Sequence, residues 1–139
     1  MPAMHYQRFI IGYHGCDEST VEKVLNDGSD LARSDNAHDW LGRGTYFWEY
    51  APERALEWAN WSKKLHGKIN TPSVVGAYIH LGHCFDLLDV KNTLALRDVY
   101  PMFIKFCRQS GKTLPVNKSA PKDQSEDMVL RFLDCAMIN

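Results

Sequence analysis

Short segments of strand-forming residues alternate along this chain with segments of helical periodicity, and glycine or proline marks most of the changes. The apolar run at residues 9–13 predicts a buried strand. Residues 17–26 predict a helix that Gly28 ends. A second strand is predicted over residues 45–48, and a second helix begins at Pro52, a residue that suits the first helical turn. This mixture of strands and helices predicts an α+β fold.

The second half of the chain gives weaker signals. A third strand is predicted over residues 73–80, and residues 85–88 are a candidate fourth strand. A helix is predicted over residues 93–108, in which Pro101 should cause a kink or a break. Residues 111–124 hold two prolines and several polar side chains, so they predict a linker or a mobile loop.

Capping residues predict where two of the helices begin. Ser19, with Glu22 three residues later, fits a capping box. Ser125 is the predicted cap of a last helix. The expected apolar face of that helix comprises Val129, Leu130, Leu133, Ala136 and Met137.

Bulk composition limits the classes of function. A length of 139 residues predicts one domain spanning residues 1–139, and a hydrophobic content of 45% argues against intrinsic disorder. Lysine and arginine number 16 against 17 acidic residues, a net charge of -1 that disfavours non-specific binding to nucleic acid.

The sequence also predicts a compartment. The N-terminus shows no secretory signal pattern, and no apolar run approaches the ~20 residues that span a bilayer. Four cysteines lie far apart without a C-x-x-C pair, which fits a reducing compartment. We therefore expect a cytoplasmic protein that does not contact membranes.

Three motifs occur in a fixed order. The first predicted strand ends in Tyr-His-Gly at residues 13–15, and Gly-Arg-Gly-Thr-Tyr-Phe follows at residues 42–47. The second predicted helix carries Ala-x-x-Trp-Ala at residues 55–59. Any one of these motifs is weak evidence by itself. Their order and their spacing on strand and helix segments make the combination specific.

Together the motifs resemble the NAD signature of the poly(ADP-ribose) polymerase catalytic domain. Residues 40–49, which read Trp-Leu-Gly-Arg-Gly-Thr-Tyr-Phe-Trp-Glu, are also similar to a motif of bacterial toxin-like ADP-ribosyltransferases. The resemblance covers residues 11 to about 90, including the third predicted strand and the turn after it. It implies the split-sheet, diphtheria-toxin-like ADP-ribosyltransferase fold, here expected to lack its C-terminal strands.

The resemblance implies how the substrate NAD is held. The backbone of Gly15 would bond the nicotinamide carboxamide, since glycine allows a close approach. His14 would bond a hydroxyl of the adenosine ribose. Tyr46 would stack on the nicotinamide ring, with Tyr13 beside it at the strand end. Trp58 is a candidate for the other face of that ring.

Further residues are implied less directly by the same resemblance. Arg43 is a candidate for the pyrophosphate and adenosine side of NAD. The loop residues Ser34, Asn36 and Asp39 are candidates for the same side.

Each assignment competes with a purely structural role. A histidine at a strand end or a tyrosine in a strand is usually a packing residue, and only the ordered motifs favour ligand contact for His14 and Tyr46. Trp58, on a helix, fits both roles equally. His80, His83 and Cys84 are not expected to hold a metal, because strand alternation places the two histidines on opposite faces.

The family's third catalytic element is a glutamate or glutamine on a late strand, which bonds the nicotinamide ribose and activates the acceptor. After Leu88 the sequence holds one glutamate, Glu126, in a segment with helical character. Glu126 is thus the candidate catalytic residue, and capping of the last helix is its competing role. Full activity is not expected from these 139 residues.

The implied function is NAD-dependent transfer of ADP-ribose to a protein or nucleic-acid acceptor, with release of nicotinamide. The nicotinamide–ribose bond breaks through an oxocarbenium-like state, as in glycoside cleavage. The alternative is an inactive or truncated copy that binds NAD, ADP-ribose or a partner protein such as an antitoxin. RNA 2'-phosphotransferases share the fold, but they rely on a cluster of arginines and histidines that this sequence does not show.

Overall fold

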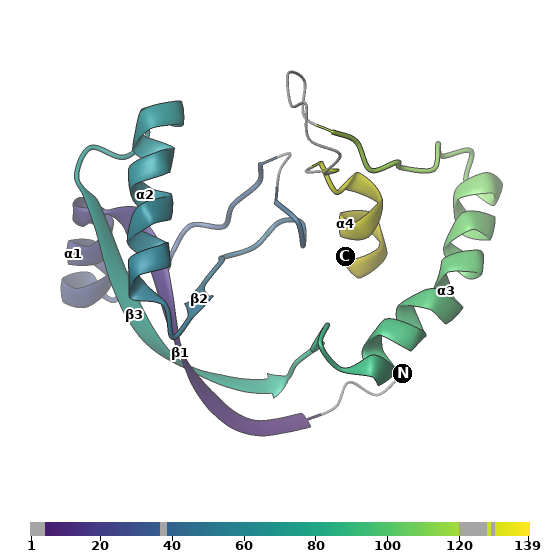
Figure 1. Cartoon of the computed structure of the whole chain (residues 1–139), viewed down its shortest axis with the longest axis horizontal. Helices are drawn as coiled ribbons and strands as arrows, with labels where there is room; N and C mark the ends of the chain where they lie inside the picture. The colour runs from purple at the N-terminus through teal and green to yellow at the C-terminus, as the bar shows by residue number, and fades with distance from the viewer. Residues whose placement is uncertain (1–4, 37–38, 120–127, 129) are drawn as a thin grey trace. The chain divides into compact units, whose positions relative to one another are not determined.

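The computed structural model describes residues 5–36, 39–119, 128 and 130–139. This part contains four helices and a three-stranded antiparallel sheet (Figure 1). The α+β class predicted from the sequence is therefore confirmed. The elements are β1 (His5–Asp17), α1 (Glu18–Asp27), β2 (Trp48–Glu49), α2 (Pro52–His66), β3 (Pro72–His83), α3 (Val90–Gln109) and α4 (Phe132–Ile138).

The chain forms two compact units. Unit 1 comprises Met1–Ala32 and Thr45–Cys84, and it holds the sheet with α1 and α2. Unit 2 comprises Arg33–Gly44 and Phe85–Asn139, and it holds α3 and α4. Among the described helices, none is long and apolar enough to cross a membrane.

β1 is the central strand of the sheet, whose order is β2-β1-β3. It pairs with β3 along almost its whole length, up to Asp17 opposite Pro72. It pairs with β2 only at Gly12 and Tyr13. Beyond Tyr13, β1 therefore has a described strand on one side only.

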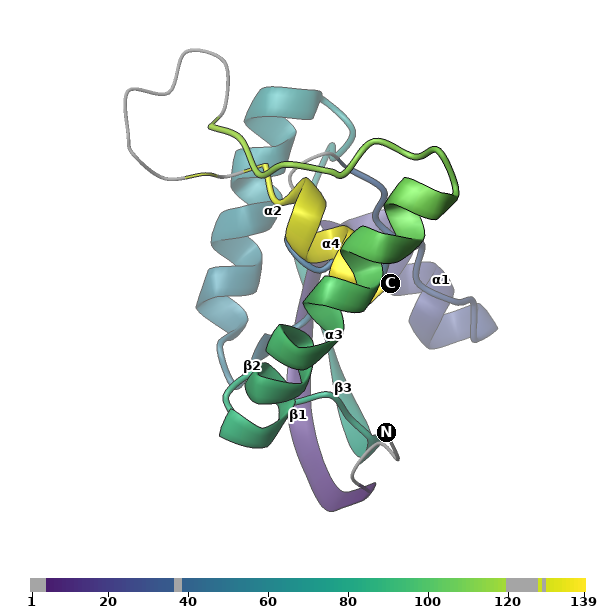
Figure 2. The ribbon, with the colours of Figure 1, turned by 90° about the vertical axis from the view of Figure 1, so that its right-hand side faces the viewer.

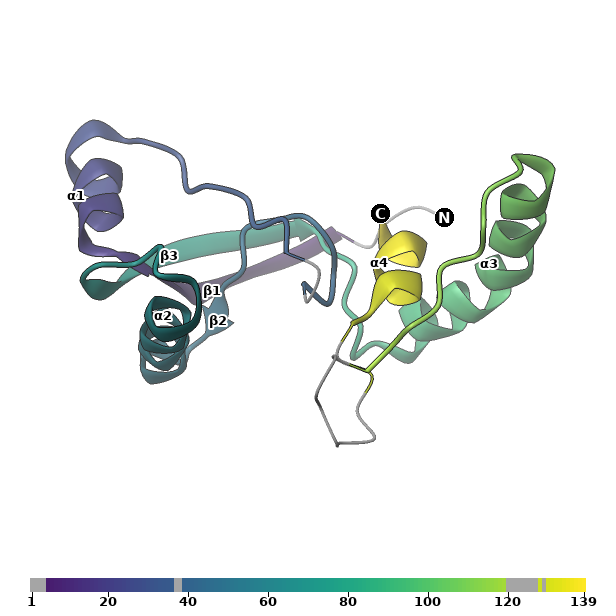
Figure 3. The same ribbon diagram turned by 90° about the horizontal axis from the view of Figure 1, so that it is seen from above.

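The two faces of the sheet differ in what covers them. Since successive strand residues alternate, Tyr13 and Gly15 lie on one face and His14 lies on the other. A Cβ atom on Gly15 would overlap the carbonyl group of Ala55 in α2, so α2 packs on the face of Gly15. We call these the α2 face and the His14 face. Figure 2 and Figure 3 show α1 and α2 on opposite sides of the sheet.

Local signals set the ends of α2 as the sequence predicts. Pro52 occupies the first turn, and Gly67 ends the helix in the left-handed conformation at φ 62°. Between these ends, Ala55, Ala59 and Ser62 are the buried residues of the helix. Because they are small, the helix lies close to the sheet.

The predicted capping box of α1 is wrong, although Gly28 ends the helix as expected. Asp17 is the N-cap, and its Oδ1 accepts a hydrogen bond from the Ser19 backbone N–H at 3.0 Å. Its Oδ2 accepts from the backbone N–H groups of Asn70 at 2.6 Å and Thr71 at 3.1 Å. One carboxylate thus joins the end of β1, the start of α1 and the segment before β3.

The bond from Thr71, followed by those from Ser19 and Asn70, holds the pKa of Asp17 well below its ordinary value of 3.8. A lowered folded-state pKa contributes stability that is fully present above the unfolded pKa and lost as the pH falls through the folded one. We expect Asp17→Asn to lower the Tm at neutral pH, and the difference from the unsubstituted protein to shrink as the pH falls below about 4. Thermal melts from pH 2 to 7 measure this. Asp30→Asn removes the same charge from an exposed loop position and should change the Tm little, so equal effects of the two variants would contradict the assignment.

The other differences from the expected elements lie in the second half and around Tyr46. Residues 85–88 are not a strand, because Asp86 and Asp89 form the turn and cap that start α3. α3 continues through Pro101, so the predicted break is absent at this exposed position in the middle of the helix, and the predicted kink stays a prediction. Of the predicted strand over residues 45–48, only Trp48 belongs to β2.

The last helix also starts later than predicted. α4 begins at Phe132, because Leu130 instead forms a bridge with Lys118. Asn117 caps it from a distance: its Oδ1 accepts from the Leu133 backbone N–H at 2.9 Å. Ser125, Glu126 and Val129 lie outside the described residues.

Candidate functional site

The first two motifs meet in unit 1 through one hydrogen bond. Nδ1 of His14 lies 2.8 Å from the carbonyl oxygen of Tyr46, 32 residues away in the sequence. A carbonyl oxygen can only accept, so Nδ1 carries the hydrogen and donates it. In a neutral His14 this bond fixes the tautomer and leaves Nε2 as an acceptor.

This bond forms where the β1–β2 ladder ends. The antiparallel register pairs Tyr13 with Trp48, so its continuation would place Phe47 opposite His14 and Tyr46 opposite Gly15. The described pairing stops before that point. On the β2 side, Gly15 therefore lies beyond the described pairing of β1 with β2.

Phe47 packs beside His14 on the His14 face. The two ring centroids are 5.7 Å apart with an interplanar angle of 53°. A Cβ atom on Gly12 would lie 3.0 Å from the Cβ of Phe47 and 2.7 Å from Cδ1 of Ile79, so the glycine leaves room for both side chains. His14 is held between an aromatic ring on one side and a carbonyl oxygen on another.

The neighbouring thiol is not a reactive group of this site. Cys16 is buried on the His14 face, and burial, together with the nearby charge of Asp17, raises the pKa of its thiol. A thiol with a raised pKa stays protonated at neutral pH and is a poor nucleophile. Cys16 is a packing residue of the core.

The structure places Trp58 and Tyr13 away from His14. Trp58 is half-buried on α2, beside the stripe of buried small residues, and α2 lies on the opposite face from His14. The ring of Tyr13 also lies on the α2 face, 3.1 Å from the position a Cβ atom would take on Gly76. The sequence could not show this, because no local signal determines which face of the sheet a helix covers. Their contact with NAD stays a prediction.

The loop predicted for the pyrophosphate side belongs to unit 2. Asp39 Oδ2 accepts from the Ser34 hydroxyl at 2.7 Å and from the Asn36 backbone N–H at 2.6 Å, which closes the loop on itself. Nε of Arg43 lies 3.7 Å from Asp35, and both side chains are exposed. The roles of these residues toward NAD stay predictions, as does that of Glu126, which lies outside the described residues.

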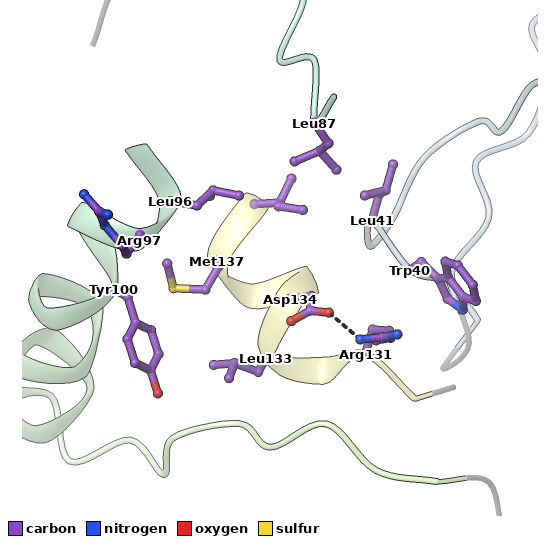
Figure 4. A pocket seen from close by; sticks show the side chains of 11 residues that line it. Trp40, Leu41, Leu87, Leu96, Arg97, Tyr100, Arg131, Leu133, Asp134 and Met137 are labelled. Carbon is purple, nitrogen blue, oxygen red and sulfur yellow. Dashed lines mark hydrogen bonds and ion pairs between the residues drawn. The ribbon is translucent and has the colours of Figure 1, made fainter. Parts of the chain in front are cut away.

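A concave site, which the motifs did not point to, lies within unit 2. A cavity of about 550 Å³ is bounded by α3, α4 and the segments around Trp40 and Leu87 (Figure 4). The residues predicted to contact NAD are absent from its described lining. No group of three or more histidine, cysteine, aspartate or glutamate residues in the described part could hold a metal ion.

No family model, curated protein or solved structure matches the chain.

Proposed function

We propose that unit 1 binds NAD at the end of β1, and that the chain carries the NAD-binding part of a split-sheet ADP-ribosyltransferase. Such an enzyme transfers ADP-ribose from NAD to a protein or nucleic-acid acceptor and releases nicotinamide. The observation that carries the proposal is the 2.8 Å bond between His14 and the Tyr46 carbonyl. It brings together the first two of the three motifs on which the resemblance rests, across 32 residues of sequence.

The state of His14 fits a ribose hydroxyl. Because Nδ1 donates to Tyr46, Nε2 of the neutral ring is an acceptor for the hydrogen of a ligand hydroxyl. Phe47 and the Tyr46 carbonyl hold the ring in one orientation, so little conformational entropy is lost on binding.

The strand edge at Gly15, beyond the described β1–β2 pairing, fits a carboxamide. A strand edge offers a backbone N–H and a backbone C=O, and the nicotinamide carboxamide carries the complementary acceptor and donor. β1 has such an edge directly after Tyr13, where its pairing with β2 ends. Tyr46 lies two residues before β2, its carbonyl is bonded to His14, and its side chain is half-buried.

Binding without turnover is the second candidate function. Glu49 is opposite Gly12 in the sheet and so lies on the His14 face. It is half-exposed, and its carboxylate lies 3.9 Å from Arg8. A solvated carboxylate beside a cation is poorly suited to stabilise charge on a ribose, since preorganisation in a water-excluded site gives that effect. This arrangement favours a module that holds NAD or ADP-ribose.

Tyr46→Ala tests the proposed site. We expect the variant to remain folded and to bind NAD about 1–3 kcal/mol more weakly, the scale of a lost aromatic contact. Calorimetric titration with NAD, with a thermal melt of each variant, measures both quantities. Tyr78→Ala is the matched control, because Tyr78 is 83% exposed and lies on β3 opposite Ile11, four residues before Gly15 on β1. An unchanged Kd for Tyr46→Ala would place Tyr46 outside the site, and an unfolded variant would make it a core residue.

A further inference from the structure

A loop of unit 2 is closed at its base by a pair of backbone hydrogen bonds. The Ser34 N–H donates to the Gly44 carbonyl at 2.6 Å, and the Gly44 N–H donates to the Ser34 carbonyl at 3.2 Å. The Ser34 hydroxyl also donates to the Asp39 carboxylate at 2.7 Å. We call the described residues of this loop, 34–36 and 39–44, the closed loop. Because its two ends are bonded to each other, a contact at its tip also affects its base.

Two side chains of α4 donate hydrogen bonds to the tip of the closed loop. Nδ2 of Asn139, the C-cap of α4, lies 2.8 Å from the carbonyl oxygen of Leu41, 98 residues away in the sequence. The Cys135 thiol donates to the Asp39 carbonyl at 2.8 Å. Both acceptors are backbone carbonyls, so these bonds fix the path of the loop backbone rather than the conformation of a loop side chain.

The packing around these bonds is close. A Cβ atom at Gly42, whose φ is 82°, would overlap the side-chain amide of Asn139. The Arg131 guanidinium lies 5.6 Å from the centre of the Trp40 ring, and Figure 4 shows the two side chains next to each other. All these residues belong to unit 2, so α4 and the residue before it hold the closed loop within one compact unit.

The base of the closed loop continues directly into the proposed NAD site. Unit 2 includes Gly44, and unit 1 resumes at Thr45. Thr45 alone separates Gly44 from Tyr46, whose carbonyl oxygen lies 2.8 Å from Nδ1 of His14. One residue contributes only two soft backbone dihedrals, so a movement of Gly44 is passed on to the Tyr46 carbonyl with little freedom to absorb it.

We propose that Asn139 is a positioning residue: by holding Leu41 it keeps the loop closed, and the closed loop keeps the Tyr46 carbonyl in place for His14. The route runs along the chain, from α4 through the loop to Tyr46. The effect on NAD rests on the proposed function, whereas the effects on the loop and on His14 can be measured without NAD.

Asn139→Ala tests the hold of α4 on the loop. It removes the bond to Leu41 and a second bond to the Cys135 carbonyl, one helical turn earlier. The backbone amides of Gly42 and Gly44 are bonded within the closed loop. We expect their hydrogens to exchange with solvent about fivefold faster in Asn139→Ala, the scale of one lost hydrogen bond.

Asn60→Ala is the matched control. Nδ2 of Asn60 also donates to the carbonyl of the residue four positions earlier, Leu56, at 2.9 Å, but both residues belong to α2. This variant therefore loses the same bond within a helix and no bond to the closed loop. It should leave the exchange of the loop amides unchanged, and thermal melts establish that both variants are folded.

The coupling to the site has a readout of its own, which a role in stability alone would not change. The nitrogen chemical shifts of the neutral His14 ring report which nitrogen carries the hydrogen. We expect the Nδ1–H tautomer in the unsubstituted chain and in Asn60→Ala, and a mixture with the Nε2–H tautomer in Asn139→Ala. Calorimetric titration should show about two- to fivefold weaker NAD binding in Asn139→Ala, since opening of the loop lowers the fraction of binding-competent protein.

Two results would overturn the proposal. Equal exchange of the loop amides in Asn139→Ala and Asn60→Ala would show that α4 does not hold the loop. Faster exchange with an unchanged His14 tautomer and an unchanged Kd for NAD would show that the loop does not position the site. If the unsubstituted chain did not bind NAD, the proposed function would fail, and the amide exchange and the tautomer would still decide whether Asn139 positions His14.

Discussion

Replacing Gly15 with alanine is expected to lower the free energy of unfolding by about 1–3 kcal/mol, the cost of forcing extra volume into a packed contact. The added Cβ would overlap the backbone carbonyl of Ala55 and lie 3.3 Å from the Cβ of Ala59. Neither group can rotate away as a long side chain could. The helix α2 must therefore move off the sheet, which exposes part of the unit 1 core.

Urea unfolding of Gly15→Ala and Gly44→Ala measures this effect. Gly44 belongs to the same set of motifs, but a Cβ atom there meets nothing within 4 Å, and its φ is not in the left-handed region. Gly44→Ala should leave the unfolding midpoint almost unchanged. If Gly15→Ala were as stable as Gly44→Ala and lost only NAD affinity, glycine would be needed at position 15 for the ligand and not for helix packing.

The elements that the sequence predicted well are those set by local signals. Gly28 and Gly67 end their helices because each takes the left-handed conformation that glycine adopts without strain. Pro52 starts α2 for an equally local reason. The apolar run at residues 9–13 lies within β1 and the run at residues 73–80 lies within β3, although both strands extend further than the runs.

The features that the sequence did not reveal depend on partners far away in the chain. The bonds of the Asp17 carboxylate to backbone groups 53 and 54 residues further along are one example, whereas its bond to the Ser19 backbone N–H is a local cap that the Ser19 and Glu22 pattern missed. Asn117 caps α4 from outside the helix. Capping motifs are recognised from residues next to the helix end. A cap supplied by another segment of the chain is therefore not visible in the sequence around the helix.

The candidate site also combines features that the sequence predicted with features that it did not reveal. The order of the motifs placed His14 and Tyr46 in one region, and the structure brings them into contact. The contact uses the backbone carbonyl of Tyr46, a group that every residue has. The presence of a tyrosine at this position therefore did not predict the bond. Nor did the motif at residues 55–59 indicate that α2 covers the face opposite His14, because a motif within one helix does not specify the face of the sheet against which that helix packs.

A transfer assay separates an enzyme from a binding module. We expect the chain to bind NAD but to transfer ADP-ribose slowly, and Glu126→Gln to leave both the slow rate and the NAD affinity within about twofold. Among the described residues, Glu49 is a carboxylate on the His14 face, but it is exposed and lies near Arg8. Loss of a preorganised charge-stabilising group typically slows a reaction by about 10²–10³, so slow transfer is the expected signature of a site without one.

The assay uses labelled NAD with cell extract or purified nucleic acid, and it compares four proteins: the unsubstituted chain, His14→Ala, Glu126→Gln and Glu49→Gln. His14→Ala should weaken NAD binding about tenfold, because it removes both the bond to Tyr46 and the proposed bond to the ribose. Glu49→Gln is the matched carboxylate control and should affect neither binding nor rate. Rapid transfer that falls by about 10²–10³ in Glu126→Gln, while the Kd for NAD is retained, would contradict the binding-module expectation. Such a split between rate and affinity would identify Glu126 as a residue that acts on the transition state, because a residue needed only for folding or for holding NAD would change the affinity as well.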